Sequence, residues 1–132
     1  MNLPVHIANH HLSTDPEVGA SQESDPDALR CASVKLASDT LPAGAYLLAE
    51  GHKHWPSTLP LMITHGTDDF ICSPSASRQF FDQVRLPQND KVYISYEGSY
   101  HEIHNEPKFW KKNVDDMIQF IKARLILNRA RL

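Results

Sequence analysis

The chain has 132 residues, of which 41% are hydrophobic and 22% charged, and its formal net charge at pH 7 is −3. This length fits one domain of ordinary size, and the composition is that of a globular protein rather than a disordered one. The negative charge argues against nucleic-acid binding, which requires a basic patch or stripe. Lysine and arginine concentrate in the last quarter of the chain, as on a solvated helix face: Lys108, Lys111, Lys112, Lys122, Arg124, Arg129 and Arg131.

The first part of the chain, residues 1–55, is polar and favours helices. Thr14-Asp15-Pro16-Glu17 has the order of an N-cap, a proline in the first turn and an acid near the positive end of the helix dipole. Asp25-Pro26-Asp27 repeats that order and predicts a second short helix. Residues 32–50 favour a longer helix, in which Pro42 should either introduce a kink or separate two helices.

The second part, residues 56–132, alternates strand and helix patterns. An apolar run over 59–64 predicts a strand that is covered on both faces, and 65–69 reads as the loop that leaves it. Ser73 followed by Pro74 predicts the start of a helix. Residues 91–96 predict a second strand, and the apolar spacing over 107–128 predicts a final helix.

This order predicts an α/β fold. The connection between the two strands is long enough for a crossover, so the strands should be parallel. Two strands do not make a stable sheet alone. The apolar pattern on both faces therefore calls for neighbouring strands that this sequence does not contain.

Two chemistry-bearing residues follow the two predicted strands. Asp69 lies three residues after Gly66, and His101 lies three residues after Gly98. The carboxyl ends of parallel strands meet at one edge of a sheet, so these side chains should converge. A carboxylate beside an imidazole fixes its tautomer and stabilises the imidazolium. Taken alone, Asp69 reads as a turn or cap residue, a role that Asp68 would fill equally well.

The motifs around these residues resemble the C-terminal part of the monoacylglycerol lipase-like α/β-hydrolases, often labelled serine aminopeptidase-type hydrolases. The resemblance rests on Leu61-Met62-Ile63-Thr64-His65-Gly66-Thr67-Asp68-Asp69, on Tyr96-Glu97-Gly98-Ser99-Tyr100-His101-Glu102 and on Asn105-Glu106-Pro107. It implies that Asp69 is the acid and His101 the general base of a catalytic triad. It also implies that residues 1–55 are a helical remnant of the cap region and 56–132 the C-terminal part of the hydrolase core, with the last two parallel strands and their flanking helices.

The sequence departs from the family because G-x-S-x-G, the segment that carries the nucleophile, occurs nowhere in it. We therefore expect a C-terminal fragment of a serine hydrolase whose full-length form cleaves lipophilic carboxylic esters, and we expect this chain alone to be inactive. Two alternatives remain open. One is a non-catalytic remnant that binds a protein partner through its exposed sheet edge, and the other is a peptidase or other acyl hydrolase of the same fold.

Other candidate sites have simpler explanations. His52 with His54, and His101 with His104, do not match a metal-binding motif, so we predict no metal and no cofactor. Ser73 reads as a helix cap and Ser99 as a turn residue, while Cys72 reads as a small buried residue rather than a replacement nucleophile. Four apolar residues at helical spacing are expected to pack against the body of the protein rather than line a lipid cavity: Leu41, Tyr46, Leu47 and Leu48.

The sequence also predicts a location. Cys31 and Cys72 form no C-x-x-C motif and no disulfide framework, which is typical of a reduced, cytoplasmic chain. Residues 1–7 do not have the pattern of a signal peptide, and no apolar stretch is long enough to span a bilayer. With a lipophilic substrate, the resemblance leaves room for peripheral association with lipid surfaces.

Overall fold

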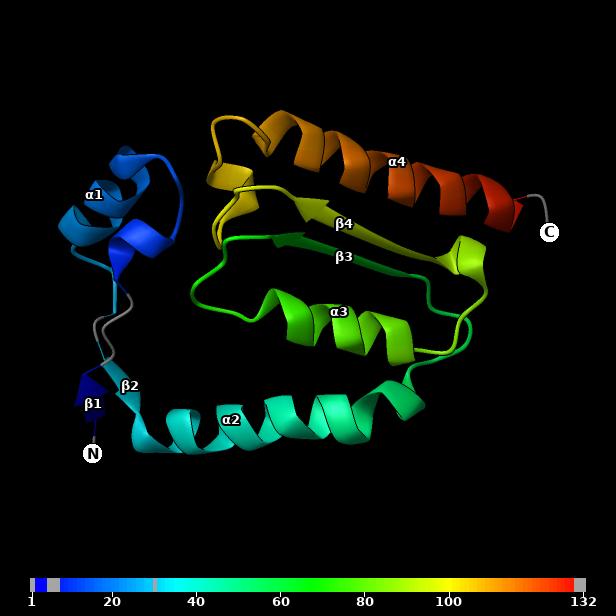
Figure 1. Ribbon diagram of the computed structural model, residues 1–132, viewed down its shortest axis with the longest axis horizontal. Coiled ribbons are helices and arrows are strands. Elements are labelled where there is room, and N and C mark those ends of the chain that lie inside the picture. The colour runs from blue at the N-terminus through cyan, green and yellow to red at the C-terminus, as the bar shows by residue number, and fades with distance from the viewer. Residues whose placement is uncertain (1, 5–7, 30, 130–132) are drawn as a thin grey trace.

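The computed structural model describes residues 2–4, 8–29 and 31–129. At its centre two parallel strands, β3 (Leu61–Gly66) and β4 (Lys91–Tyr96), pair in register from Leu61 with Lys91 to Gly66 with Tyr96. Helix α3 (Pro74–Gln83) connects the strands and covers one face of the pair, and α4 (Trp110–Arg129) covers the other face (Figure 1). This is the predicted α/β order, with two parallel strands and flanking helices.

The start and end of α3 follow from local chemistry. The Ser73 side chain accepts a hydrogen bond from the backbone N–H of Ala76, as an N-cap does, and Pro74 stands in the first turn. At the other end, the ammonium of Lys91 donates to the carbonyl oxygens of Phe81 and Val84 at 2.9 and 3.0 Å. Because Lys91 opens β4, these bonds fix the second strand to the end of the connecting helix.

The main hydrophobic core lies between α3 and the strand pair. Leu61, Phe81 and Val84 are buried there. Partly buried side chains surround these three: Trp55, Ile63, Phe80, Leu86 and Tyr93. The core holds β3 and β4 against one helix, so it positions the loops that leave the strands.

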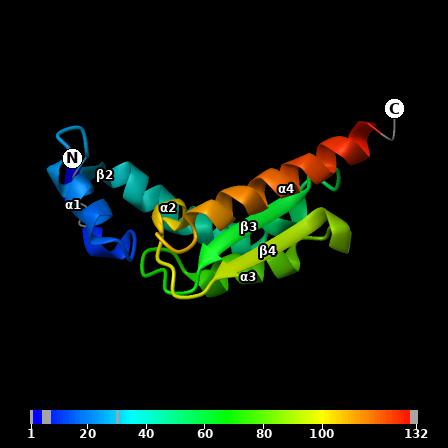
Figure 2. The ribbon, with the colours of Figure 1, turned by 90° about the horizontal axis from the view of Figure 1, so that it is seen from above.

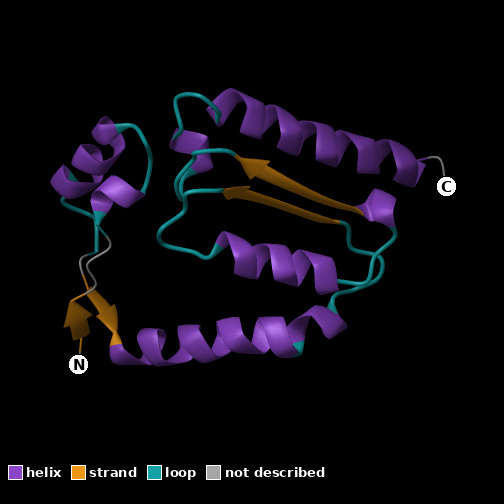
Figure 3. Cartoon of the chain, in the orientation of Figure 1, coloured by secondary structure: helices purple, strands orange, loops and turns teal. Residues whose placement is uncertain are grey.

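The N-terminal part has an antiparallel pair of short strands that the sequence did not predict. Strand β1 (Asn2–Pro4) pairs with β2 (Cys31–Ser33), and helices α1 (Pro16–Ser24) and α2 (Val34–Ala49) follow β1 and β2 respectively (Figure 3). The prediction of α1 is confirmed, with Asp15 as its N-cap. The predicted helix at 25–27 is wrong, because the Asp25 carboxylate accepts the N–H of Asp27 in a turn that follows the end of α1.

Helix α2 is a single helix that runs through Pro42. The expectation that its apolar residues pack against the body is wrong for three of them. Leu41, Tyr46 and Leu47 are 80%, 54% and 49% exposed. Helix α2 lies beyond α3, on the side of α3 away from the strands (Figure 1).

The segment before α1 lies against the loops at the carboxyl ends of the strands, the end of the molecule where Figure 2 shows α1. The backbone N–H of Glu102 donates to the carbonyl oxygen of Leu12 at 2.7 Å, and the hydroxyl of Ser13 donates to the carbonyl oxygen of Asn105 at 3.0 Å. Buried Glu106 accepts the backbone N–H groups of Thr14 and Tyr100 with one oxygen and the hydroxyl of Thr14 with the other. This carboxylate therefore joins the N-terminal segment to the loop after β4.

Helix α4 turns a polar side towards the described strands. Asn113 is 2% exposed, and Asp116 accepts a hydrogen bond of 2.6 Å from the hydroxyl of buried Tyr96. The predicted apolar stripe of this helix is 37–59% exposed: Trp110, Val114, Met117, Ile118, Ile121 and Leu125. An amphipathic helix normally buries its apolar stripe. The α4 stripe is therefore a surface that lacks its packing partner in this structure.

Candidate active site

The loops after β3 and β4 are tied together by their backbones. The N–H of Thr67 donates to the carbonyl oxygen of Tyr96, and that of Asp68 donates to the carbonyl oxygen of Ser99, both at 3.0 Å. The hydroxyl of Thr67 accepts the N–H of Gly98, which turns the second loop with a φ of +77°. The two loops therefore behave as one unit at the edge of the sheet.

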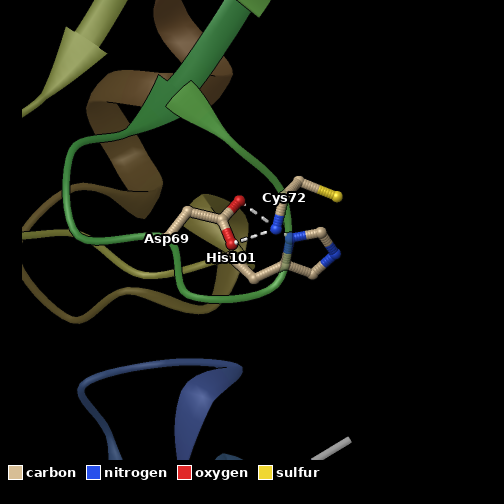
Figure 4. A group of neighbouring side chains, drawn as sticks. All are labelled: Asp69, Cys72 and His101. Atoms are coloured by element: carbon tan, nitrogen blue, oxygen red, sulfur yellow. Dashed lines mark hydrogen bonds and ion pairs between the residues drawn. The ribbon is translucent and has the colours of Figure 1, made fainter. Parts of the chain in front are cut away.

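This unit brings Asp69 and His101 together, as the sequence predicted. The Asp69 Oδ2 atom lies 3.0 Å from His101 Nδ1 (Figure 4). Because a carboxylate only accepts, Nδ1 carries the proton of this bond in the neutral ring, and Nε2 is left with a free lone pair. The Asp69 side chain is 3% exposed and the His101 side chain 35% exposed. The pair thus has a buried acid and an accessible ring. This suits a general base whose tautomer is fixed by the carboxylate at Nδ1 while Nε2 stays accessible.

Backbone donors hold the Asp69 carboxylate. Its Oδ1 atom accepts the N–H groups of Ile71 and Cys72 at 2.8 and 2.9 Å. Burial acts to raise the pKa of Asp69, but the hydrogen bonds from Cys72, His101 and Ile71 outweigh it and lower the pKa below its ordinary value. The carboxylate therefore stays ionised around neutral pH, as stabilising an imidazolium requires.

Sequence reasoning missed a third member of this cluster, His65. The sequence predicts His65 in the loop after the strand, but it lies in β3. Its Nε2 is 3.0 Å from Asp69 Oδ2 and 3.3 Å from the carbonyl oxygen of Cys72. On the other side of the ring, Nδ1 is 2.8 Å from the hydroxyl of Ser77. One signal in the sequence could have indicated this residue. His65 stands near the end of the strand that leads to Asp69, four residues before it.

Cys72 does not have the properties of a nucleophile. The prediction of a buried residue is wrong, because Cys72 is exposed. Although the residue as a whole is exposed, partial desolvation of its thiol raises the pKa of Cys72, and the negative charge of Asp69 raises it further, so the reactive thiolate is disfavoured. Ser73 caps α3 as predicted, and Ser99 is 0% exposed, which removes it from contact with a substrate.

Asp69, Cys72 and His101 also offer three ligand atoms of the kinds that metal ions bind, all within 4.8 Å of one another. Each oxygen of Asp69 already has two nitrogen neighbours. Oδ1 faces the backbone N–H groups of Ile71 and Cys72, and Oδ2 faces the rings of His65 and His101. A cation would have to displace one of these contacts and deprotonate a thiol whose pKa is raised. The donor set therefore fits a hydrogen-bonded acid–histidine pair better than a metal site.

Comparisons with known proteins agree with this geometry. The profile of the family described as serine aminopeptidase, S33, matches residues 1–108. A monoacylglycerol lipase of Mycolicibacterium smegmatis is 32% identical over 121 residues, which is 86% of this chain and 39% of that protein. A Schizosaccharomyces pombe protein, provisionally named a monoglyceride lipase, is 32% identical over 102 residues, which is 77% of this chain and 26% of that protein.

Solved structures show the same fold. A soluble variant of the Saccharomyces cerevisiae monoglyceride lipase, in complex with a substrate analogue, matches 93% of this chain and 44% of its own with a TM-score of 0.82 and 26% identity. The monoacylglycerol lipase of Paleococcus ferrophilus matches 91% of this chain and 45% of its own with a TM-score of 0.73 and 21% identity. The strands, their helices and these matches define the chain as a partial α/β-hydrolase fold.

The chain belongs to the serine aminopeptidase S33 family and is monoacylglycerol lipase-like within it. It spans 39% and 26% of the length of the two relatives described above and 44–45% of the two solved lipases. Among the residues that the structure describes, none of the helices combines the length and hydrophobicity that crossing a bilayer requires.

Proposed function

We propose that this chain supplies the acid and the general base of a serine ester hydrolase that acts on monoacylglycerols or similar lipophilic esters. The observation that carries the proposal is the 3.0 Å contact between Asp69 Oδ2 and His101 Nδ1, made by a buried acid and an accessible ring. The substrate class is taken from the lipases to which the chain is similar.

The chemistry follows from the two ring nitrogens of His101. The free Nε2 accepts the proton of a serine hydroxyl as its oxygen attacks the ester carbonyl, and the resulting imidazolium stays paired with Asp69 through Nδ1. The same proton then passes to the leaving alcohol, and a water molecule hydrolyses the acyl-enzyme with His101 again as base. Asp69 remains ionised throughout, in keeping with its lowered pKa.

The nucleophile and the oxyanion donors are expected from residues outside this sequence, which has no G-x-S-x-G. The exposed α4 stripe supports this proposal, because the missing part of a hydrolase sheet would give that stripe a packing partner. Residues 1–55 are proposed to derive from the cap region and 56–132 from the hydrolase core. A cytoplasmic location with peripheral contact to lipid surfaces completes the proposal.

A chimera tests this function. The segment of the Saccharomyces cerevisiae monoglyceride lipase that corresponds to this chain is replaced by residues 1–132, and hydrolysis of a monoacylglycerol is measured. We expect activity in the chimera, a fall in kcat of about 10³-fold or more with Asp69→Asn or His101→Ala, and little change with the control His104→Ala. The unfused chain should show no turnover. A folded, active chimera that is unaffected by His101→Ala would contradict the proposal.

Two other functions have their own discriminating results. Hydrolysis of an aminoacyl anilide in preference to the ester by the same chimera would indicate a peptidase. One observation favours a non-catalytic interaction module. Among the described strands, β3 pairs only with β4, so a sheet edge is left free for a partner. An upstream reading frame that encodes G-x-S-x-G would favour the hydrolase, whereas its absence beside an authentic promoter would favour the module.

A further inference from the structure

We propose that His65 is a positioning residue for the acid–base pair, and that it acts through Asp69 and the loop that follows it. This inference rests on the proposed function, since it concerns the same pair. His65 lies beside the acid–base pair but is not itself one of its two members, Asp69 and His101. Its side chain is 12% exposed, and both of its ring nitrogens have a polar neighbour.

The neighbours of Nε2 determine the tautomer of His65. One is Oδ2 of Asp69 at 3.0 Å and the other is the carbonyl oxygen of Cys72 at 3.3 Å. Both atoms are acceptors only, so Nε2 must carry a proton. In the neutral ring Nδ1 is then an acceptor, and the Ser77 hydroxyl at 2.8 Å is the donor.

Ser77 is itself held in place by α3 and β4. Its oxygen lies 2.8 Å from the hydroxyl of Tyr93 and 2.9 Å from the carbonyl oxygen of Pro74. Ser77 has one hydroxyl proton, so when it donates to His65 it no longer donates to Pro74, and the Tyr93 hydroxyl can donate to the Pro74 carbonyl instead, at 3.2 Å. The three side chains therefore have a consistent set of donors that keeps the His65 proton on Nε2.

The consequence reaches His101 along two routes. His65 places a donor beside Oδ2, the same oxygen that receives His101 Nδ1–H. It also holds the carbonyl of Cys72, whose own N–H is bonded to Oδ1 of Asp69. Removing the imidazole would leave the carboxylate held mainly through Oδ1 and would release the carbonyl of Cys72, so the hydrogen bond that fixes the His101 tautomer would weaken.

The histidine tautomers can be read directly by NMR in the full 132-residue chain, without any substrate. Long-range ¹H–¹⁵N spectra, recorded at a pH where the rings are neutral, give the proton position on His65 and His101, with assignments from single replacements. We expect His65 to carry its proton on Nε2 and His101 to carry its proton on Nδ1. A His65 ring protonated on Nδ1 in the unaltered chain would overturn the proposal, whatever the variants do.

The variants test the coupling. His65→Phe should lower the Nδ1–H to Nε2–H ratio of His101 about fivefold, as expected for the loss of one ordinary hydrogen bond. His65→Gln keeps an N–H donor and should restore much of the ratio, Ser77→Ala should lower it less, and the exposed His54→Phe is the matched control. An unchanged ratio in a His65→Phe chain whose amide spectrum is native would refute the role of His65.

A parallel variant separates this proposal from the proposed function. Asp69→Asn places an amide donor where His101 now has an acceptor, so it should move the His101 proton to Nε2. If Asp69→Asn leaves the His101 tautomer unchanged, the acid–histidine pair itself fails. If Asp69→Asn shifts it while His65→Phe does not, the pair stands and only the positioning role of His65 is lost.

Discussion

Gly66 lies directly against the backbone of Tyr100. A Cβ atom built on Gly66 would stand 2.2 Å from the carbonyl oxygen of Tyr100 and 2.3 Å from that of Ser99. These atoms belong to rigid backbone rather than to flexible side chains. The end of β3 can therefore approach the loop that carries His101 only because residue 66 has no side chain.

Gly66→Ala should consequently destabilise the protein and separate the two loops. We expect a loss of about 3 kcal/mol in the free energy of unfolding, measured by urea denaturation, since the overpacked atoms cannot move aside. Gly44→Ala is the control, because nothing lies within 4 Å of its added Cβ in helix α2. That replacement should raise stability by about 1 kcal/mol. Equal effects of the two would contradict the contact at Gly66.

Glu106 offers a second test, since its 1% exposed carboxylate joins Thr14 to Tyr100. Glu106→Gln removes the negative charge that strengthens these hydrogen bonds, and its N–H₂ group forces the Thr14 hydroxyl to change from donor to acceptor. We expect a loss of about 2 kcal/mol in the free energy of unfolding and faster amide exchange at Tyr100. The exposed Glu97→Gln should change stability by no more than about 0.5 kcal/mol. Unchanged exchange at Tyr100 in Glu106→Gln would argue against the clamp.

Tyr96 predicts an alkaline dependence of stability. Burial, followed by its hydrogen bond to Asp116, raises the pKa of Tyr96 to about 12. The unfolded chain releases this proton near pH 10, whereas the folded chain keeps it, so this contribution to stability is present below pH 10 and is lost as pH rises through 12. Urea denaturation of the unaltered chain and Tyr96→Phe across this range should show the loss only in the former. Parallel curves would refute the shift.

Asp69 predicts the opposite dependence at acid pH. Its hydrogen bonds lower the pKa in the folded state, so its contribution to stability is present above the unfolded value of about 3.9 and is lost as pH falls through the folded value. The difference in unfolding free energy between the unaltered chain and Asp69→Asn should therefore shrink on acidification. Asp68→Asn, at an exposed neighbour, is the control. A difference that is constant with pH would show that Asp69 does not titrate as proposed.

Much of the site geometry was predictable because it depends on local patterns and one topological rule. The apolar run before Gly66, the capping pair Ser73-Pro74 and the β-branched run that leads to Tyr96 predicted the strands and the helix between them. Parallel pairing then required the segments of Asp69 and His101 to meet at one edge. The catalytic role of the two residues remains a prediction, since proximity alone does not establish it.

His65 and the short strands β1 and β2 were not predictable in the same way. The proposed role of His65 depends on Cys72, Ser77 and Tyr93, which lie on three other segments and come together only in the folded chain. The sequence also did not predict that the apolar residues of α2 and α4 are exposed. An apolar stripe predicts that a helix buries one face, but it does not say which part of a protein covers that face.

The pairing of Gly66 with Tyr96 has a consequence for how this fold tolerates changes in length. One inserted residue in either strand would advance its loop by about 3.3 Å and would turn the following side chains to the opposite face of the sheet. Insertions beside the exposed residues Pro87, Gln88 and Asn89, by contrast, would lengthen a surface turn and leave both strand ends where they are. Length variation among natural or engineered versions of this chain should therefore collect in that turn and be absent from the strands themselves.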